Sequence, residues 1–292
     1  MVDITEVAEK IYRFETPVPG LFYVPTVYLI NEPDGVLIEP GPAVAIPSIQ
    51  EVMRYLGMKD LAWIMPTHIH MDHAGGAGMW AQIFPRAKVL VHPRGVKHAV
   101  DPSRLIEGTR AFWGDDFENR FGPIIPISES QVKVPEDDEI IPVSGRELRI
   151  LYAPGHAPHH MAIFDQSMTG LFCGEAVGMP GYQIPTAVPP GFNLEDYLGT
   201  IDRLSLLEAS VFFYSHGGAE RDTEVLISRA KETARVYGDM VMEGLKRGDT
   251  WEDIGRMLAD HISRQFGLDL DGGSLVNVVA GYAVYFKNKG LA

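Results

Sequence analysis

The chain has 292 residues, 46% of them hydrophobic, which is enough for a sizeable core in one large domain or two small ones. Its formal net charge of -14 would repel a phosphate backbone, and no Lys or Arg run offsets that field, so nucleic acid is excluded as a partner. The single cysteine, Cys173, excludes an intrachain disulfide and a Cys-rich zinc site. These properties suit a reducing interior.

Neither a targeting segment nor a membrane span is expected. No basic region followed by an apolar one opens the chain, and the apolar stretch of residues 275–286 is too short to cross a bilayer. We therefore predict a cytoplasmic protein that does not bind membranes.

Short apolar runs separated by Pro and Gly clusters predict a strand meander at residues 11–14, 21–24, 27–30 and 36–38. A helix should follow the break at residues 40–42. Ser48 and Glu51 fit a capping box at its start, and Gly57 fits its end. The apolar face of that helix would consist of Ile49, Val52, Met53 and Leu56.

A predicted strand at residues 61–65 leads into the most informative stretch of the chain, THIHMDHAGG at residues 67–76. It holds His68, His70, Asp72 and His73. Neutral imidazole and carboxylate are ligands of zinc and similar divalent ions, and four such groups in one loop can serve two metals. The small residues at 74–78 keep side chains away and open a helix towards Phe84. A strand at 89–91 then gives the alternation of strand and helix that predicts an α/β layered core.

Residues 95–135 are expected to form an irregular insertion, since Pro and Gly repeatedly interrupt any long element. Its aromatic residues are interpreted as packing anchors, with the lining of a substrate pocket as the alternative. They are Phe112, Trp113, Phe117 and Phe121. His92 and His98, near the start of the insertion, are interpreted as ordinary polar residues.

Strands predicted at residues 148–151, 171–173 and 211–214 are each followed by a candidate ligand. These candidates are His156, Glu175 and His216. Apolar strands that each end in a histidine or carboxylate beside a small residue predict ligands converging at one sheet edge. A further strand is expected at residues 161–164. His159 or His160 would either hydrogen-bond near the site or be structural, and Cys173 is interpreted as a packing residue.

The remaining chain predicts long helices at residues 219–246, 250–266 and 274–289. We predict a core domain over residues 1–218 and a helical segment over 219–292 that completes or covers it. An apolar stripe at residues 276, 279, 282 and 286 would be buried either within the chain or in a homodimer.

These motifs resemble those of the metallo-β-lactamase superfamily over roughly residues 10–220. The HxHxDH pattern runs from His68 to His73, a PGH loop ends at His156, and Glu175 and His216 follow strands. The resemblance implies a four-layer αββα sandwich with a two-metal site on its edge. It implies that the first metal is bound by His68, His70 and His156, the second by Asp72, His73 and His216, and that Glu175 bridges them. The stretches at residues 92–95, 101–105 and 157–160 resemble those of a lactonase-like, largely uncharacterised branch of the superfamily rather than those of true β-lactamases.

Two carboxylates depart from the family pattern. Glu175 and Glu39 stand where the family usually has Asp, so each side chain is one methylene longer than in the family pattern. The longer arm at Glu175 would change the metal spacing, lower the occupancy of one site or be absorbed by a backbone shift. Glu39 would either orient the ligand loop or be an ordinary carboxylate at a strand end.

The ligand set predicts a hydrolase. Two divalent ions about 3.5–4 Å apart can share a hydroxide whose pKa lies near neutrality, and they can polarise the carbonyl that it attacks. We predict a dinuclear metallohydrolase of a small, neutral ester or lactone, with zinc as the first choice of metal and iron or manganese as alternatives. Asp72 would carry a proton to the leaving group.

Other functions fit parts of the pattern. A glyoxalase II-like thioesterase and an iron-dependent persulfide dioxygenase share much of it. A non-enzymatic, metal-stabilised binding protein is disfavoured because a scaffold needs no open coordination position. The acidic charge disfavours a nuclease. His70 and the lack of room for a flavin domain disfavour a diiron flavoprotein.

Overall fold

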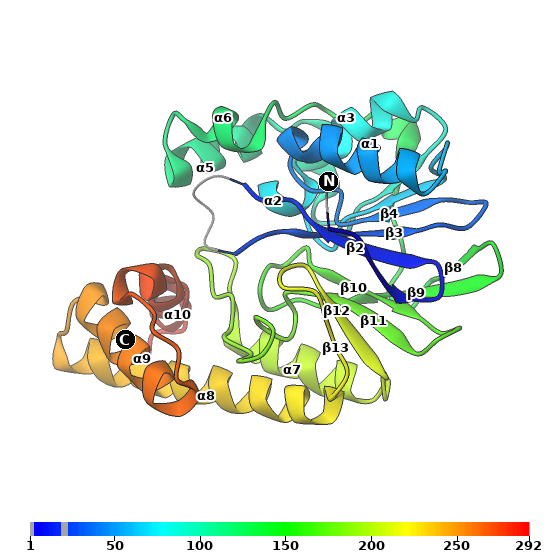
Figure 1. Ribbon diagram of the computed structural model, residues 1–292. Helices are drawn as coiled ribbons and strands as arrows, with labels where there is room; N and C mark the ends of the chain where they lie inside the picture. The colour runs from blue at the N-terminus through cyan, green and yellow to red at the C-terminus, as the bar shows by residue number, and fades with distance from the viewer. Residues whose placement is uncertain (1–2, 19–22, 292) are drawn as a thin grey trace. The chain divides into compact units, whose positions relative to one another are not determined.

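The computed structural model describes residues 3–18 and 23–291, except for the side chain of Phe112 (Figure 1). The chain divides into two units whose segments alternate along the sequence. Unit 1 comprises Met1–Tyr152, Met161–Gly174 and Phe212–Ala219, and unit 2 comprises Ala153–His160, Glu175–Val211 and Glu220–Ala292. The predicted division at residues 218 and 219 stays a prediction.

The first sheet of unit 1 has seven strands in sequence order within the described part of the chain. Strands β1 to β4 pair antiparallel and β4 to β7 pair parallel. The bounds are β1 Thr5–Ala8, β2 Ile11–Glu15, β3 Thr26–Ile30, β4 Val36–Ile38, β5 Trp63–Met65, β6 Lys88–Leu90 and β7 Val132–Lys133. The predicted meander is therefore confirmed at β2, β3 and β4. The strand predicted at 21–24 falls partly on residues 21 and 22, outside the described ones, and residues 23 and 24 form no strand.

The second sheet is ordered β13-β12-β11-β10-β9-β8. Its strands are β8 Ile140–Val143, β9 Arg146–Tyr152, β10 Met161–Asp165, β11 Gly170–Gly174, β12 Val211–Tyr214 and β13 Ala219–Glu220. The ring of Tyr28 in the first sheet lies 5.3 Å from that of Phe172 and 5.6 Å from that of Phe213 in the second. Aromatic edges and faces therefore join the two sheets inside unit 1. The sequence predicted β9 to β12 but neither β8 nor β13.

Helix α1, Ile46–Tyr55, begins earlier than predicted. Its N-cap is Ala45, no side chain caps it, and Pro47 occupies the first turn. The predicted capping box at Ser48 and Glu51 is therefore wrong. Proline is favoured at this place because its missing N–H has no partner there in any helix. The apolar face was predicted correctly, since Ile49, Val52 and Met53 are buried.

The ligand stretch continues into two short helices, α2 Met71–Ala74 and α3 Ala77–Ile83. The segment expected to be an irregular insertion is largely helical, with α4 Val96–Val100, α5 Ser103–Trp113 and α6 Phe117–Phe121. The interrupting Pro and Gly residues lie between these helices or end them, as Gly114 and Gly122 do at φ +82° and +79°.

The aromatic residues of this segment are packing anchors where the structure describes them. Phe117 and Phe121 are buried in a cluster with Val18 and Met71, and the half-buried Trp113 packs against it. The Phe112 side chain lies outside the described atoms. Met71 is also the first residue of α2 in the ligand stretch, so this cluster anchors the start of that helix.

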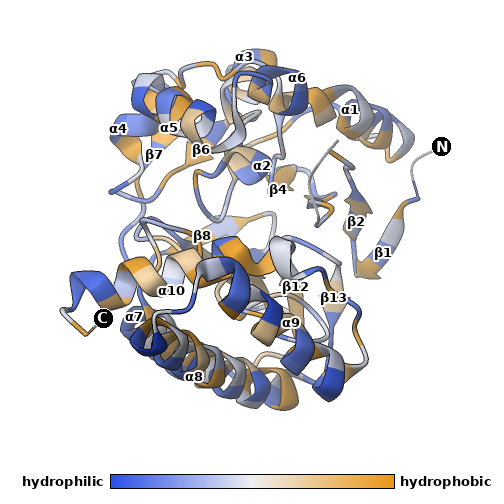
Figure 2. Ribbon diagram, turned by 90° about the vertical axis from the view of Figure 1, so that its left-hand side faces the viewer, coloured by the Kyte–Doolittle hydropathy of each residue, from blue (hydrophilic) through white to orange (hydrophobic). Residues whose placement is uncertain are grey.

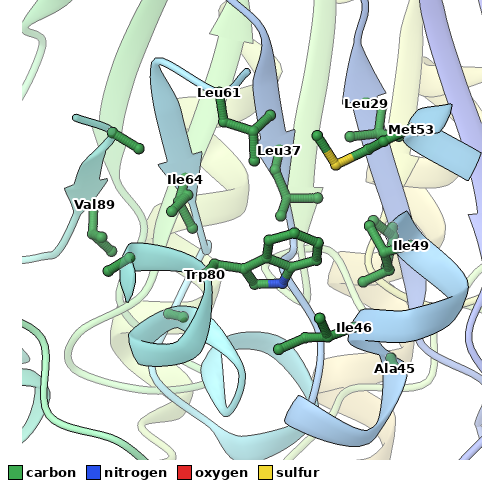
Figure 3. Packing of buried hydrophobic residues seen from close by; sticks show 14 of the residues in the cluster. Leu29, Leu37, Ala45, Ile46, Ile49, Met53, Leu61, Ile64, Trp80 and Val89 are labelled. Atoms are coloured by element: carbon green, nitrogen blue, oxygen red, sulfur yellow. The ribbon is translucent and has the colours of Figure 1, made fainter. Parts of the chain in front are cut away.

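The core of the first sheet is built around Trp80 of α3 (Figure 3). The indole is fully buried among aliphatic side chains from α1 and the sheet, including Leu37, Ile49 and Ile64. Its Nε1–H donates to the Pro40 carbonyl at 3.1 Å. Trp80 thus fills the space between α1 and α3 and also holds the chain just after β4.

Unit 2 is helical, with α7 Leu194–Ser205, α8 Thr223–Arg247, α9 Trp251–Phe266 and α10 Val276–Asn288. Figure 2 shows α8 and α9 with alternating hydrophilic and hydrophobic colours, as expected of amphipathic helices. Thr250 caps α9 by accepting from the Asp253 N–H, as predicted. Helix α7 was not predicted. No helix of the described chain is long and apolar enough to cross a membrane.

Replacing Trp80 by Phe should lower the free energy of unfolding by roughly 2–4 kcal/mol, because it opens a cavity and leaves the Pro40 carbonyl without its donor. Urea denaturation in the presence of EDTA measures this. The matched control is Trp251→Phe, at a side chain that is 42% exposed, where the change should stay within about 0.5 kcal/mol. Equal stability of the two variants would contradict the prediction.

Candidate metal centre

The seven predicted ligands all lie after strands, but they are divided between the two units. Unit 1 holds the four ligands of the stretch after β5 and His216 after β12. Unit 2 holds His156 and Glu175, which follow β9 and β11.

Asp72, His73 and His216 form a cluster in unit 1. One possible ligand atom from each lies within 4.8 Å of the other two. Asp72 Oδ2 is 3.3 Å from His73 Nε2 and 3.5 Å from His216 Nε2. Both imidazoles are buried, whereas the Asp72 side chain is 23% exposed. The structure therefore brings together, from two distant strands, three side chains that the resemblance assigns to one metal.

His68 and His70 lie next to this cluster. His68 Nε2 and His70 Nδ1 are 2.9 Å apart, and the ring of His68 is centred 4.1 Å from that of His73. Only Ile69 separates the two residues, and their rings meet edge to face with centroids 4.5 Å apart. The four ligand candidates of the HxHxDH pattern therefore face a common place within unit 1.

Glu39, at the end of β4, orients two of these rings. Thr67 Oγ1 donates to Glu39 Oε1 at 2.5 Å, and His73 Nδ1 lies 3.2 Å from Glu39 Oε2. The single hydroxyl proton of Thr67 is used on Glu39, so at its 3.0 Å contact with His68 Nδ1 the ring must donate. A carboxylate can only accept, so His73 also donates from Nδ1. In both rings Nδ1 is therefore occupied as a donor, which leaves Nε2 as the atom that can bind a metal.

The backbone supports this arrangement. Glu39 has φ +53°, a left-handed conformation that is uncommon for a residue with a side chain, and it turns the chain out of β4. Immediately afterwards, Gly41 donates its N–H to the His73 carbonyl at 2.9 Å and accepts from the Gly76 N–H at 2.8 Å. A Cβ on Gly76 would lie 3.0 Å from the Gly41 oxygen. The predicted need for small residues after the ligands thus has a physical cause.

The electrostatics of the cluster favour a positive charge. Burial lowers the pKa of the His73 imidazole, but the carboxylates of Asp72 and Glu39 outweigh that effect and raise this pKa well above its ordinary value. Two carboxylates placed beside buried imidazoles make a pocket that suits a cation.

His156 and Glu175 meet within unit 2. His156 Nδ1 lies 2.6 Å from the Thr186 carbonyl, which can only accept, so the ring donates from Nδ1 and its Nε2 carries the lone pair. That Nε2 lies 2.8 Å from Glu175 Oε2. Two acceptors at this distance repel each other unless a proton or a metal cation lies between them. This pair therefore fits a cation as well.

His160 supports Glu175 from the other side. It is fully buried, and its Nε2 accepts from the Glu175 N–H at 3.1 Å. Sequence reasoning left its role open between a site contact and a structural one, and the structure gives it a hydrogen bond to a ligand candidate. Thr67 and Thr186 were not predicted to take part. Thr67 directly precedes the first ligand, but Thr186 carries no signal in the sequence because it acts through its backbone carbonyl.

His92 and Cys173 have partners other than the candidate ligands. His92 packs 4.3 Å from the Tyr152 ring, and its Nδ1 accepts from the Arg94 N–H. Burial, with Arg94 adding to it, lowers the pKa of His92 to about 4, so the ring is neutral at neutral pH. Cys173 is buried in β11, with Sγ 3.4 Å from the Phe213 carbonyl. The interpretations of His92 as an ordinary polar residue and of Cys173 as a packing residue agree with these contacts.

The donor set of both groups fits divalent metal ions. Each contains one imidazole that donates from Nδ1 and has Nε2 beside a carboxylate, namely His73 in unit 1 and His156 in unit 2. Imidazole with carboxylate is the ligand chemistry of zinc and of iron or manganese. Buried carbonyl, hydroxyl and carboxylate groups hold the rings in that tautomer, as is usual behind metal-binding histidines.

Comparisons with known proteins agree with this chemistry. A sequence model of the Metallo-beta-lactamase superfamily matches residues 20–216. A metallo-beta-lactamase fold-containing protein of Sulfurisphaera tokodaii is 29% identical over 201 residues, which are 67% of this chain and 73% of that protein. A hydroxyacylglutathione hydrolase of a Synechococcus species is 28% identical over 192 residues, or 65% of this chain and 62% of that one.

Solved structures share the fold. A metallo-beta-lactamase family protein from Thermus thermophilus superposes with a TM-score of 0.75 at 20% sequence identity, covering 98% of this chain and 95% of that chain. The predicted α/β fold class is therefore confirmed.

Replacing Glu39 by Gln should weaken metal binding by roughly 10- to 100-fold. An amide has only one acceptor oxygen and no charge, so it cannot accept hydrogen bonds from both Thr67 and His73 as the carboxylate does. Competition with a chromophoric chelator measures the dissociation constant. The matched control is Asp165→Asn, which neutralises another buried carboxylate, one bound to Arg146. The control should lose stability and keep its metal affinity. Unchanged affinity in Glu39→Gln would contradict an orienting role.

Proposed function

The chain belongs to the metallo-beta-lactamase superfamily, and from that membership we propose that it is a dinuclear metal-dependent hydrolase of a small ester or lactone. One observation carries the proposal. Asp72, His73 and His216 are gathered within 4.8 Å in a buried place where Glu39 sets the tautomer of His73. A scaffold would have no need to orient Nε2 of a buried imidazole towards a second carboxylate, that of Asp72.

We propose Asp72, His73 and His216 as the ligands of one ion. For the other ion, the proposal follows the family pattern and takes His68, His70 and His156, with Glu175 as the shared carboxylate. When bound, two such ions supply Lewis acidity, which polarises a carbonyl and brings the pKa of water near neutrality. Zinc is the first choice, with iron or manganese as alternatives.

Groups of the protein itself orient the imidazoles and transfer protons. Glu39 and the Thr186 carbonyl keep the imidazoles in one tautomer, which removes a rearrangement that would otherwise precede binding. The Asp72 side chain is 23% exposed, whereas His73 and His216 are buried, so its carboxylate is the group we propose to take the proton of the attacking water and transfer it to the leaving alcohol.

The substrate class rests on charge. The net charge of -14 slows the approach of anionic substrates, which favours neutral esters and lactones. The second candidate is thioester hydrolysis, which is favoured by the likeness to a hydroxyacylglutathione hydrolase over 65% of this chain. A cytoplasmic location remains a prediction from the single cysteine.

The purified chain should bind close to two divalent ions, and removing them with a chelator should abolish hydrolysis. Elemental analysis of protein made with zinc, iron or manganese, combined with a panel of neutral lactones, esters and thioesters, measures both. We expect the highest kcat/KM on a neutral lactone or ester. A strongly anionic thioester as the best substrate would select the second candidate, and oxygen consumption with an iron-loaded protein would select a dioxygenase. Protein that retains no ion, or only one, would contradict the two-metal proposal.

Glu175→Gln should lose the more weakly held ion first, because the amide keeps the side-chain length but removes the charge beside His156 Nε2. Glu175→Asp should retain both ions, with activity changed by roughly tenfold, since the carboxylate is kept but withdrawn by one methylene. Metal content after dialysis and kcat measure these effects. Two ions and parental activity in Glu175→Gln would reclassify Glu175 as a structural carboxylate.

A homodimer is proposed for the assembly. The apolar stripe of α10 is mostly buried within the chain, at Val279, Tyr282 and Phe286, so the half-buried Val276 and its neighbours are the part left for a partner copy. Light scattering at high micromolar concentration tests this proposal, and a monomer there would count against it.

A further inference from the structure

A buried tyrosine of the first sheet holds the turn that carries His216. Tyr28 lies in β3, and only 1% of its side chain is exposed. Its phenolic oxygen lies 2.6 Å from the Tyr214 carbonyl oxygen and 2.9 Å from the Gly218 carbonyl oxygen. These carbonyls stand two residues before and two residues after His216. One hydroxyl group therefore bridges both ends of the turn.

The backbone of β3 adds to this support. The Thr26 N–H donates to the Ser215 carbonyl at 2.7 Å, and Pro25 forms an antiparallel bridge with His216. Within the turn, the Tyr214 N–H donates to the Gly218 carbonyl at 2.8 Å. The carbonyl of Gly218 thus receives two donors, and the turn is joined to the first sheet at several consecutive residues.

The Tyr28 ring has little freedom to move away. It packs edge-on against Phe172 and Phe213, whose own rings are stacked 4.6 Å apart. Burial raises the pKa of Tyr28 well above its ordinary value, so the phenol keeps its proton and stays a donor. Loss of the hydroxyl would leave two buried carbonyls with one fewer donor between them.

The turn determines where the His216 imidazole stands. Its ring is centred 5.0 Å from that of His73, and its Nε2 lies 3.5 Å from Asp72 Oδ2. A displacement of the turn by a fraction of an ångström alters both distances, and metal sites tolerate little such error. His73 and Asp72 are held from the first sheet through Glu39 and α2, whereas His216 arrives from the second sheet.

We propose that Tyr28 is the positioning residue that sets His216 against Asp72 and His73, and so controls the affinity of the ion that these three residues bind. The proposal rests on the proposed function, because it presupposes that the cluster binds a metal. It assigns Tyr28 no part in the chemistry itself.

The test compares zinc binding by the whole protein, by Tyr28→Phe and by Tyr282→Phe. Tyr282 is the matched control, because it is also a buried phenol that donates to a backbone carbonyl, that of Ala234 at 2.8 Å, between helices α8 and α10, which carry no ligand candidate. Both variants should lose similar thermal stability. The dissociation constant of one of the two zinc ions, the one proposed at Asp72, His73 and His216, should rise at least roughly tenfold in Tyr28→Phe only, and that of the other ion should be unchanged. Visible absorption of the cobalt-loaded protein should shift only in that variant.

Each outcome decides a separate question. Equal zinc affinities in all three proteins, or equal losses in both variants, would overturn the proposal for Tyr28. If the parent binds no zinc, the proposed function itself is wrong. If Tyr28→Phe does not fold, Gly218→Ala replaces it. Gly218 has φ +98°, a conformation that L side chains rarely adopt, so an alanine there strains the same turn while the phenol stays. The same selective loss of one of the two ions is expected, and its absence would overturn the proposal.

Discussion

The carboxylate of Glu39 is the contact on which the candidate metal centre depends. It accepts from Thr67 through one oxygen and from His73 through the other, so a single side chain fixes the start and the end of the HxHxDH stretch. Its backbone leaves β4 at φ +53°, which brings the carboxylate over the end of the neighbouring parallel strand β5. Trp80 then holds the next carbonyl, that of Pro40, from within the hydrophobic core. The packing of the first sheet therefore helps to set the orientation of the candidate ligands.

The second sheet contributes through backbone contacts. The Thr67 carbonyl accepts from the Met161 N–H at 2.7 Å, which ties the ligand stretch to the start of β10. The His216 turn follows β12 of the second sheet, and Tyr28 and Thr26 bind it to β3 of the first sheet. Each sheet thus holds a loop that belongs to the other. Reciprocal support of this kind keeps imidazoles from distant parts of the sequence at fixed separations, which a metal site requires.

Several elements were predictable because their signals are local. The apolar face of α1, the Thr250 cap of α9 and the strand β12 depend on residue spacing within one short window. The predicted start of α1 was wrong because Ser48 and Glu51 match a capping-box pattern, whereas the helix begins two residues earlier with a proline in its first turn. The helices α4 to α6 were missed because a Pro or Gly lies within two residues of the end of each. For α6, which has only five residues, burial of Phe117 and Phe121 adds stability that propensity does not supply.

The sequence by itself determined the ligand chemistry of this protein. The residue types at 68, 70, 72, 73, 156, 175 and 216, and their places after strands, are chemical and local facts that need no coordinates. Only the tertiary structure decided which ring nitrogen His73 and His156 present and what holds the turn of His216. Those choices depend on partners distant in sequence: Glu39 for His73, the Thr186 carbonyl for His156 and the Tyr28 hydroxyl for the His216 turn. A backbone carbonyl has the same identity in every residue, so no sequence pattern can mark it before the chain has folded around it.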